Sequence, residues 1–293
     1  MTRRAEYCSV ECQNAALASY HKVVCFQTTA RDGSHPLEQL NETWKQMNYP
    51  PETSSIFLFA RILAMVNQAS DKAAVLHHFS QFCHHAVNED AQIAHKLLGQ
   101  NFVSQLDVLR EMLVSTLGSA DNQHWLTPDG FRSLVAMVGT NGQGVGSSPL
   151  AEWARRAGTL DGIPQQEKEE LDAFIDKLYE DLEEETDGFL NCEGSALYSL
   201  QSKCNHSCAP NAEICFLHAN SRLTLRATRA IPEGEEVCIS YLSPCDLTRS
   251  RHSRHKLLRE NYLFECQCPR CEGEIGDPDV TSDEDLSEDE EES

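Results

Sequence analysis

The sequence predicts an α+β fold, with helices in its first half and short strands dominating the part after residue 200. From Pro36 to Trp125, apolar residues recur every three or four positions, which is the spacing of amphipathic helices. After residue 205, β-rich runs alternate with turn residues such as those at 232–234. A chain of 293 residues that is 40% hydrophobic can bury a core and form one or two domains.

The charge of the chain excludes some classes of partner. Of the net charge of −22, ten acidic residues and no basic one lie in 277–293, which leaves −12 for the rest. So acidic a block is too polar to bury, and we expect residues 272–293 to form a disordered tail. The negative net charge argues against direct nucleic-acid binding and favours a basic protein as partner. The need for solubility is an alternative explanation of the same charge.

No targeting or membrane signal stands out. No apolar run approaches the ~20 residues that a membrane span needs, and no apolar signal core follows Met1. We therefore expect an intracellular protein of the nucleus or cytoplasm without membrane contact. Its thirteen cysteines are then expected to be thiols or zinc ligands rather than disulfides.

Two pairs of metal-ligand residues lie in the first 25 positions. They are Cys8 with Cys12 and His21 with Cys25, each at i, i+4 spacing, and the stretch between them is typical of a helix. Zinc prefers four nitrogen or sulfur ligands. The alternative is a helix with buried cysteines and a surface histidine, which four ligand-type residues in this pattern disfavour.

The helical pattern continues through three amphipathic stretches. Apolar residues recur in 56–66, 75–83 and 102–113. Five histidines between 77 and 95 have no matching Cys or carboxylate at close spacing, so we interpret them as solvent-facing or satisfied histidines. This part carries no recognisable chemistry.

A glycine-rich stretch follows the next helix. Thr127-Pro128 should open a helix that runs to about Val138. The run Gly139–Gly146 then predicts a loop, and it lacks the Lys-Ser/Thr and the strand-to-helix frame of a phosphate-binding loop. Residues 164–187 predict a strongly acidic helix with a solvated face.

Three motifs in the last third carry the chemistry. They are Asn205-His206-Ser207-Cys208, the run Val237-Cys238-Ile239-Ser240-Tyr241, and Cys266-Gln267-Cys268-Pro269-Arg270-Cys271. Each motif alone has a simpler interpretation: the first as a polar turn, the second as a strand that ends in an ordinary tyrosine, and the third as a cluster of reactive thiols. Together, in this order, they resemble the C-terminal half of a SET domain, the fold of protein lysine methyltransferases.

The resemblance implies an S-adenosylmethionine-dependent enzyme that methylates lysines of histones or other basic proteins. It implies Tyr241 as the catalytic residue that orients the lysine amine. The positions that match the family's contacts to the methyl donor are Asn141, Ser202, Asn205, His206, Tyr241 and Phe264. It also implies a zinc held by Cys208, Cys266, Cys268 and Cys271.

The first 25 residues resemble the second half of a MYND zinc finger, which points to the SET-and-MYND family. In that family the finger interleaves two zincs and interrupts the SET domain. By this resemblance, we expect the chain to start inside the finger and to lack the segment that carries a Gly-x-Gly contact to the methyl donor. An inactive form that acts through protein contacts is therefore the alternative to an active methyltransferase.

The resemblance divides the chain into five parts. They are the finger (1–25), a helical insert (26–125), the C-terminal part of the SET domain (126–265), the post-SET cysteines (266–271) and the acidic tail (272–293).

Overall fold

The computed structural model describes most of the chain. The described residues are 7, 9–25, 36–47, 55–88, 92–93, 96–145, 149–160, 162–186 and 194–278. Residues 279–293 of the expected disordered tail lie outside this part. Its first residues are ordered, because a helix (Pro269–Gly273) reaches into it and Glu274 pairs with Arg254 and Arg270, so residue 272 was too early a start for the tail. Within the described residues, no helix is long and apolar enough to cross a membrane.

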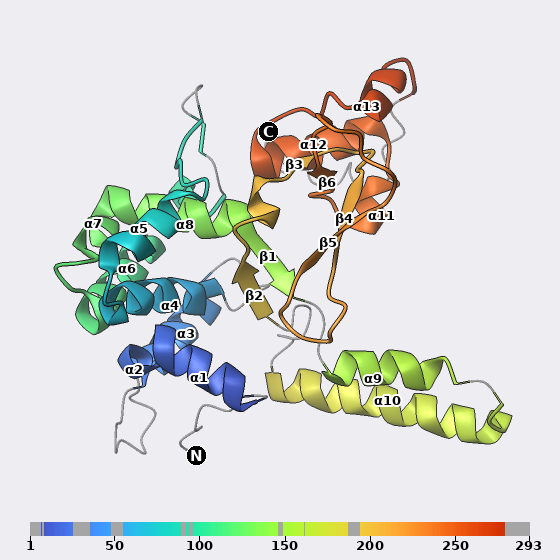
Figure 1. The fold of residues 1–293 in the computed structure, drawn as a ribbon, viewed down its shortest axis with the longest axis horizontal. Coiled ribbons are helices and arrows are strands. Elements are labelled where there is room, and N and C mark those ends of the chain that lie inside the picture. Colours follow the sequence, from blue (N-terminus) through green and yellow to red (C-terminus); the bar gives the residue numbers. More distant parts are fainter. Residues whose placement is uncertain are drawn as a thin grey trace.

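Helices build the first half, as predicted. They are α1 (Val10–Ser19), α2 (His21–Val24), α3 (Pro36–Lys45), α4 (Ser55–Gln68), α5 (Lys72–Ser80), η1 (Lys96–Leu98), η2 (Gln100–Phe102), α6 (Val103–Leu117), α7 (Gln123–Leu126) and α8 (Pro128–Asn141). Helix α4 is apolar on most sides and supplies Ile56, Leu63 and Val66, all with 0% exposure. Helices α3, α5, α6 and α8 pack around it, so one apolar core joins residues 40 to 138 (Figure 1).

Side-chain caps set several helix starts. Ser9 accepts a hydrogen bond from the backbone N–H of Cys12 at the start of α1, and Asp71 accepts one from Ala74 at the start of α5. Thr127 caps α8, and Pro128 occupies its first turn, where no backbone N–H is needed. The sequence prediction for the start of α8 is therefore confirmed.

The glycine-rich segment is not a loop where we expected one. Helix α8 runs on to Asn141, and Gly142–Val145 form strand β1, which pairs antiparallel with β2 (Gly194–Leu197). The physical reason lies at Gly142, where a Cβ would stand 2.5 Å from the carbonyl oxygen of Val138. Glycine therefore permits a direct passage from helix to strand. The prediction of a loop over 139–146 was wrong for its described residues.

The second half contains short strands in pairs. Strand β3 (Asn205–His206) pairs parallel with β6 (Cys238–Ile239), and β4 (Ala212–Cys215) pairs antiparallel with β5 (Thr224–Ala227). The pair β4–β5 confirms the β-rich runs expected after residue 205, and it follows the motif at 205–208, called the signature motif below. The predicted turn is also present, with Gly234 at φ 87°.

Five further helices complete the described structure. They are α9 (Pro149–Gly158), α10 (Gln165–Thr186), α11 (Pro244–Leu247), α12 (Arg251–Tyr262) and α13 (Pro269–Gly273), with a short η4 (Gln201–Lys203) before β3. Helix α10 is the acidic helix that the sequence predicts. Figure 1 shows the helical group around α4 on one side and α11–α13 on the other, with β1 and β2 between them.

Candidate functional site

The parallel pair β3–β6 brings the first two motifs together. Asn205 lies beside Cys238 and His206 beside Ile239, so the signature motif meets the strand that leads to Tyr241. The Nδ1 atom of His206 then accepts a hydrogen bond from the backbone N–H of Tyr241 at 2.9 Å. Residues 35 positions apart in the sequence are thereby fixed as one unit.

The ring of His206 is neutral and fully engaged by the protein. Burial, with a smaller effect of Arg254, lowers the pKa of His206 to about 4. Because Nδ1 accepts a bond, the proton of the neutral ring resides on Nε2, which lies 3.3 Å from the Sγ atom of Cys208. The ring therefore links Tyr241 to the cysteine cluster.

The hydroxyl of Tyr241 has a fixed direction. It donates to the backbone carbonyl of Cys204 at 2.9 Å. Burial, followed by the neighbouring Tyr262, raises the pKa of Tyr241 to about 12, so the hydroxyl stays protonated at neutral pH. A held, neutral phenol can orient a polar group in front of it but does not act as a base.

Three aromatic rings gather around the ring of Tyr241. The ring centroid of Tyr241 lies 4.8 Å from that of Tyr262, 5.4 Å from that of His206 and 6.3 Å from that of Phe264. Leu263 takes a left-handed conformation (φ 58°) at the end of α12, and its neighbours Tyr262 and Phe264 both line the same cavity. The π-faces of such rings attract cations.

A large cavity joins the residues that the sequence predicts to contact the methyl donor. It has a volume of about 1430 Å³ and is lined by all six of them, namely Asn141, Ser202, Asn205, His206, Tyr241 and Phe264. They come from α8, η4, β3, the turn after β6 and the segment after α12. The structure thus brings together residues that are far apart in the sequence.

The amide nitrogen of Asn141 is held by the protein. Its buried side chain donates from Nδ2 to the carbonyls of Cys83 (2.7 Å) and Met137 (2.8 Å). With the nitrogen held in this way, the side-chain oxygen is the atom that can accept a hydrogen bond from an ammonium group. Asn205, in contrast, is tied by its Nδ2 to Glu236 at 2.6 Å.

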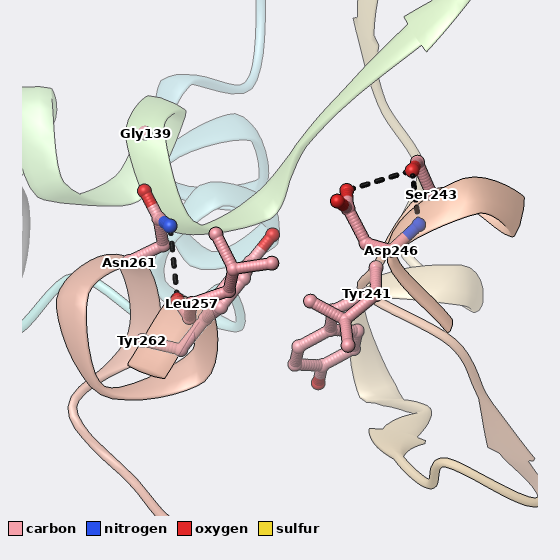
Figure 2. Close-up of a pocket in the computed structure, with 8 residues that line it drawn as sticks. Gly139, Tyr241, Ser243, Asp246, Leu257, Asn261 and Tyr262 are labelled. Carbon is pink, nitrogen blue, oxygen red and sulfur yellow. Dashed lines mark hydrogen bonds between the residues drawn. The ribbon is translucent and has the colours of Figure 1, made fainter. Parts of the chain in front are cut away.

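A smaller cavity of about 180 Å³ also borders Tyr241 and Tyr262. It is lined by Gly139, Tyr241, Leu242, Ser243, Asp246, Leu257, Asn261 and Tyr262. Figure 2 shows it between α12, which carries Asn261 and Tyr262, and the segment from Tyr241 to Asp246, which includes the start of α11. Tyr241 and Tyr262 therefore line both cavities.

Cys208 of the first motif and the three cysteines of the last motif form one cluster. The sulfur atoms of Cys208, Cys266, Cys268 and Cys271 all lie within 4.8 Å of one another. A tetrahedral zinc with bonds of about 2.3 Å needs sulfurs ~3.8 Å apart, so these residues fit a zinc ion. Among the described residues, no other group of three or more metal-ligand side chains gathers in this way.

The environment of the cluster suits thiolates at a metal. Three of the cysteines are at most 4% exposed, and burial raises the pKa of Cys208. Burial also tends to raise the pKa of Cys268, but hydrogen bonds from the Cys271 backbone and nearby groups bring it to about 6. A buried set of thiolates requires a cation, which a metal supplies.

The expected finger ligands are only partly described. Cys8 lies outside the described residues, while Cys12 and Cys25 are exposed. The Nδ1 atom of His21 lies 2.7 Å from the hydroxyl of Tyr7. The proposed finger zincs thus stay a prediction.

Three residues of the site have no role in the sequence prediction. Tyr262 lines both cavities, Asn211 joins the signature motif to β6, and Arg254 reaches the cysteine cluster. Tyr262 could have been proposed from the sequence, because it is an aromatic residue two positions before Phe264. Asn211 belongs to the stretch that carries the SET resemblance, but its role depends on contacts with residues 235–238, and these, like the contacts of Arg254, only the fold reveals.

Comparisons with known proteins identify the family of the chain. The SET domain family model matches residues 11–242. The chain is 56% identical over 278 residues to "Protein-lysine N-trimethyltransferase SMYD5" of Gallus gallus and 54% to that of Homo sapiens, which covers 95% of this chain in each case. It is 44% identical over 94 residues to "Histone-lysine N-methyltransferase SMYD3" of Mus musculus, covering 32% of this chain and 21% of that protein.

The chain spans 66% of the chicken and human proteins, just under two thirds, and 67% of the Danio rerio relative, to which it is 49% identical. In the sequence, the acidic block that directly follows the post-SET cysteines most resembles the fifth member of the SET-and-MYND family, and these matches confirm that resemblance. The chain belongs to the SET-domain family and, within it, to the SET-and-MYND group of lysine methyltransferases.

Proposed function

We propose that this chain holds the site of an S-adenosylmethionine-dependent protein-lysine methyltransferase. The observation that carries the proposal is the pair of cavities that share Tyr241 and Tyr262 as walls. Methyl transfer needs two substrates that approach one point from different sides while water is kept out. A large cavity for the methyl donor and a small one for a lysine side chain meet that need.

Different residues of the chain would bind the methyl donor and orient the lysine amine. S-adenosylmethionine, when bound, supplies a methyl group on a positively charged sulfur. The rings of Tyr241, Tyr262 and Phe264 line its cavity and favour a cationic centre there. The fixed hydroxyl of Tyr241 orients the neutral lysine amine, and Asn141 offers its carbonyl oxygen to the amino-acid part of the methyl donor.

The substrate is a lysine-bearing basic protein, a histone or another. Asp246 lines the smaller cavity, and the chain carries −22 overall, which supports attraction of a basic segment.

The Tyr241→Phe variant tests this function. It keeps the ring but loses the hydroxyl, so we expect methyl transfer to a histone mixture to fall at least about a hundredfold through kcat. The affinity for S-adenosylmethionine, measured by calorimetry, should stay within a few-fold. A wild-type chain that binds no methyl donor, or a variant with full activity, contradicts the proposal.

We also propose that Cys208, Cys266, Cys268 and Cys271 hold one structural zinc that fixes the segment after α12 against the cavity. Cys268→Ser should remove that zinc and lower the melting temperature, because a three-thiolate site binds more weakly. Cys245→Ser is the matched control, since Cys245 is an exposed thiol outside the cluster. Equal zinc content in Cys268→Ser and the control speaks against the site.

A further inference from the structure

Arg254 is a buried cation that the proposed reaction does not use. It lies on α12 with 0% exposure. One guanidinium nitrogen, Nη1, donates to the carbonyl of Arg249 at 2.6 Å, and Nη2 lies 2.6 Å from a carboxylate oxygen of Glu274. A fully buried charge is costly unless other charges and hydrogen bonds compensate it.

The one carboxylate near Arg254 is shared. Glu274 also pairs with Arg270, whose Nε lies 2.8 Å from its other oxygen. Two guanidinium groups and one carboxylate leave a charge of +1. Among the described contacts of Arg254, the cysteine cluster is the remaining source of negative charge.

The guanidinium reaches that cluster directly. Its Nη2 atom lies 3.4 Å from the Sγ atom of Cys271, and it also hydrogen-bonds to Cys208. Four thiolates around Zn²⁺ carry a net charge of −2. The net charge of +1 on Arg254, Arg270 and Glu274 partly offsets it. The buried arginine and the thiolate cluster thus compensate each other, and neither is well accommodated alone.

We infer that Arg254 is a positioning residue of the thiolate site, donating N–H···S hydrogen bonds that retain the metal and lock α12 to α13. The inference rests on the zinc site proposed above. Arg254 also connects the thiolate site to the cavities. Its helix, α12, ends at Tyr262, which lines both cavities, and Phe264, which lines the large one, follows two residues later. Groups that hydrogen-bond to the ligands of a metal orient those ligands and tune their electron density.

The test compares wild type with Arg254→Met, Arg254→Lys and a control, Arg259→Met. Arg259 lies on the same helix and pairs with Glu265 at 2.7 Å, but both side chains are about half exposed. Two readouts apply: transfer of zinc to a coloured chelator, and the sulfur-to-metal charge-transfer bands after substitution with Co²⁺. These bands report directly on hydrogen bonds to the thiolates.

We expect Arg254→Met to weaken zinc retention by about 10- to 100-fold and to shift the Co²⁺ bands, with Arg259→Met unchanged. Arg254→Lys keeps the charge and should fold even if the Met variant does not. It should show an intermediate loss, because an ammonium cannot reproduce the planar fork.

The outcomes separate the two proposals. Wild type without bound zinc overturns the zinc site and this inference together. Zinc in wild type, with the retention and Co²⁺ spectrum of Arg254→Lys unchanged, overturns the role of Arg254 alone.

Discussion

At the scale of single residues, Asn211 holds the site together although it is not part of the aromatic group. Its side chain is 3% exposed. Its Nδ2 donates to a carboxylate oxygen of Glu235 (2.9 Å) and to the backbone carbonyl of Glu236 (2.8 Å), while its Oδ1 accepts from the backbone N–H of Cys238 (2.8 Å). One amide thus joins the end of the signature motif to the start of β6.

Replacing Asn211 by Ala should therefore destabilise the second half of the chain. The change leaves buried backbone groups without partners, so we expect the free energy of unfolding to fall by about 2–4 kcal/mol. Chemical denaturation of the zinc-bound protein measures it. Asn220→Ala is the control, because exposed Asn220 makes a single bond to the backbone of Arg222. A loss below about 0.5 kcal/mol for Asn211→Ala is incompatible with this role.

The sequence and the structure agree best where a residue belongs to a motif. Asn205, His206, Tyr241 and Phe264 are recognisable from their order and spacing, and they line one cavity. The sequence could not reveal that both nitrogens of His206 are engaged, because this depends on the parallel pairing of β3 with β6. Buried contacts between distant residues have no local signature.

At the scale of elements, the passage from α8 to β1 shows why glycine alone predicts poorly. A glycine-rich run usually marks a loop, because glycine adopts many conformations. Here Gly142 has an ordinary φ of −62°, so its lack of a side chain matters rather than its freedom. Because Gly142 has no Cβ, its backbone can pass close to the carbonyl of Val138, so the helix ends and the strand begins without a connecting loop.

Substituting Gly142 by Ala should be costly for that reason. A Cβ 2.5 Å from a backbone oxygen forces the backbone to move, which we expect to cost about 1–3 kcal/mol. Gly158→Ala is a matched control, because a Cβ there meets nothing within 4 Å. Thermal unfolding of both variants decides the matter. Equal melting temperatures argue that the helix-to-strand passage tolerates a side chain.

At the scale of the whole molecule, the large cavity depends on both halves of the chain. Cys83, His85 and Asn141 line it from the helical half, and His206 and Phe264 line it from the other half. The pairing of β1 with β2 and the bond from Lys203 to the carbonyl of Gln81 connect the two sides. A ligand in the cavity should therefore order segments that are far apart in the sequence.

Hydrogen exchange with S-adenosylhomocysteine tests this coupling. We expect the ligand to slow amide exchange both in residues 81–88 and in residues 262–268, because it contacts both walls of one cavity. A hundredfold excess of ligand over its Kd should also stabilise the fold by about 2.7 kcal/mol. The control is zinc-stripped protein, in which the response of residues 262–268 should be lost because the proposed zinc fixes that wall. Protection confined to residues 262–268 would mean that the helical half contributes no wall to the methyl-donor site, and that Asn141 does not contact the ligand.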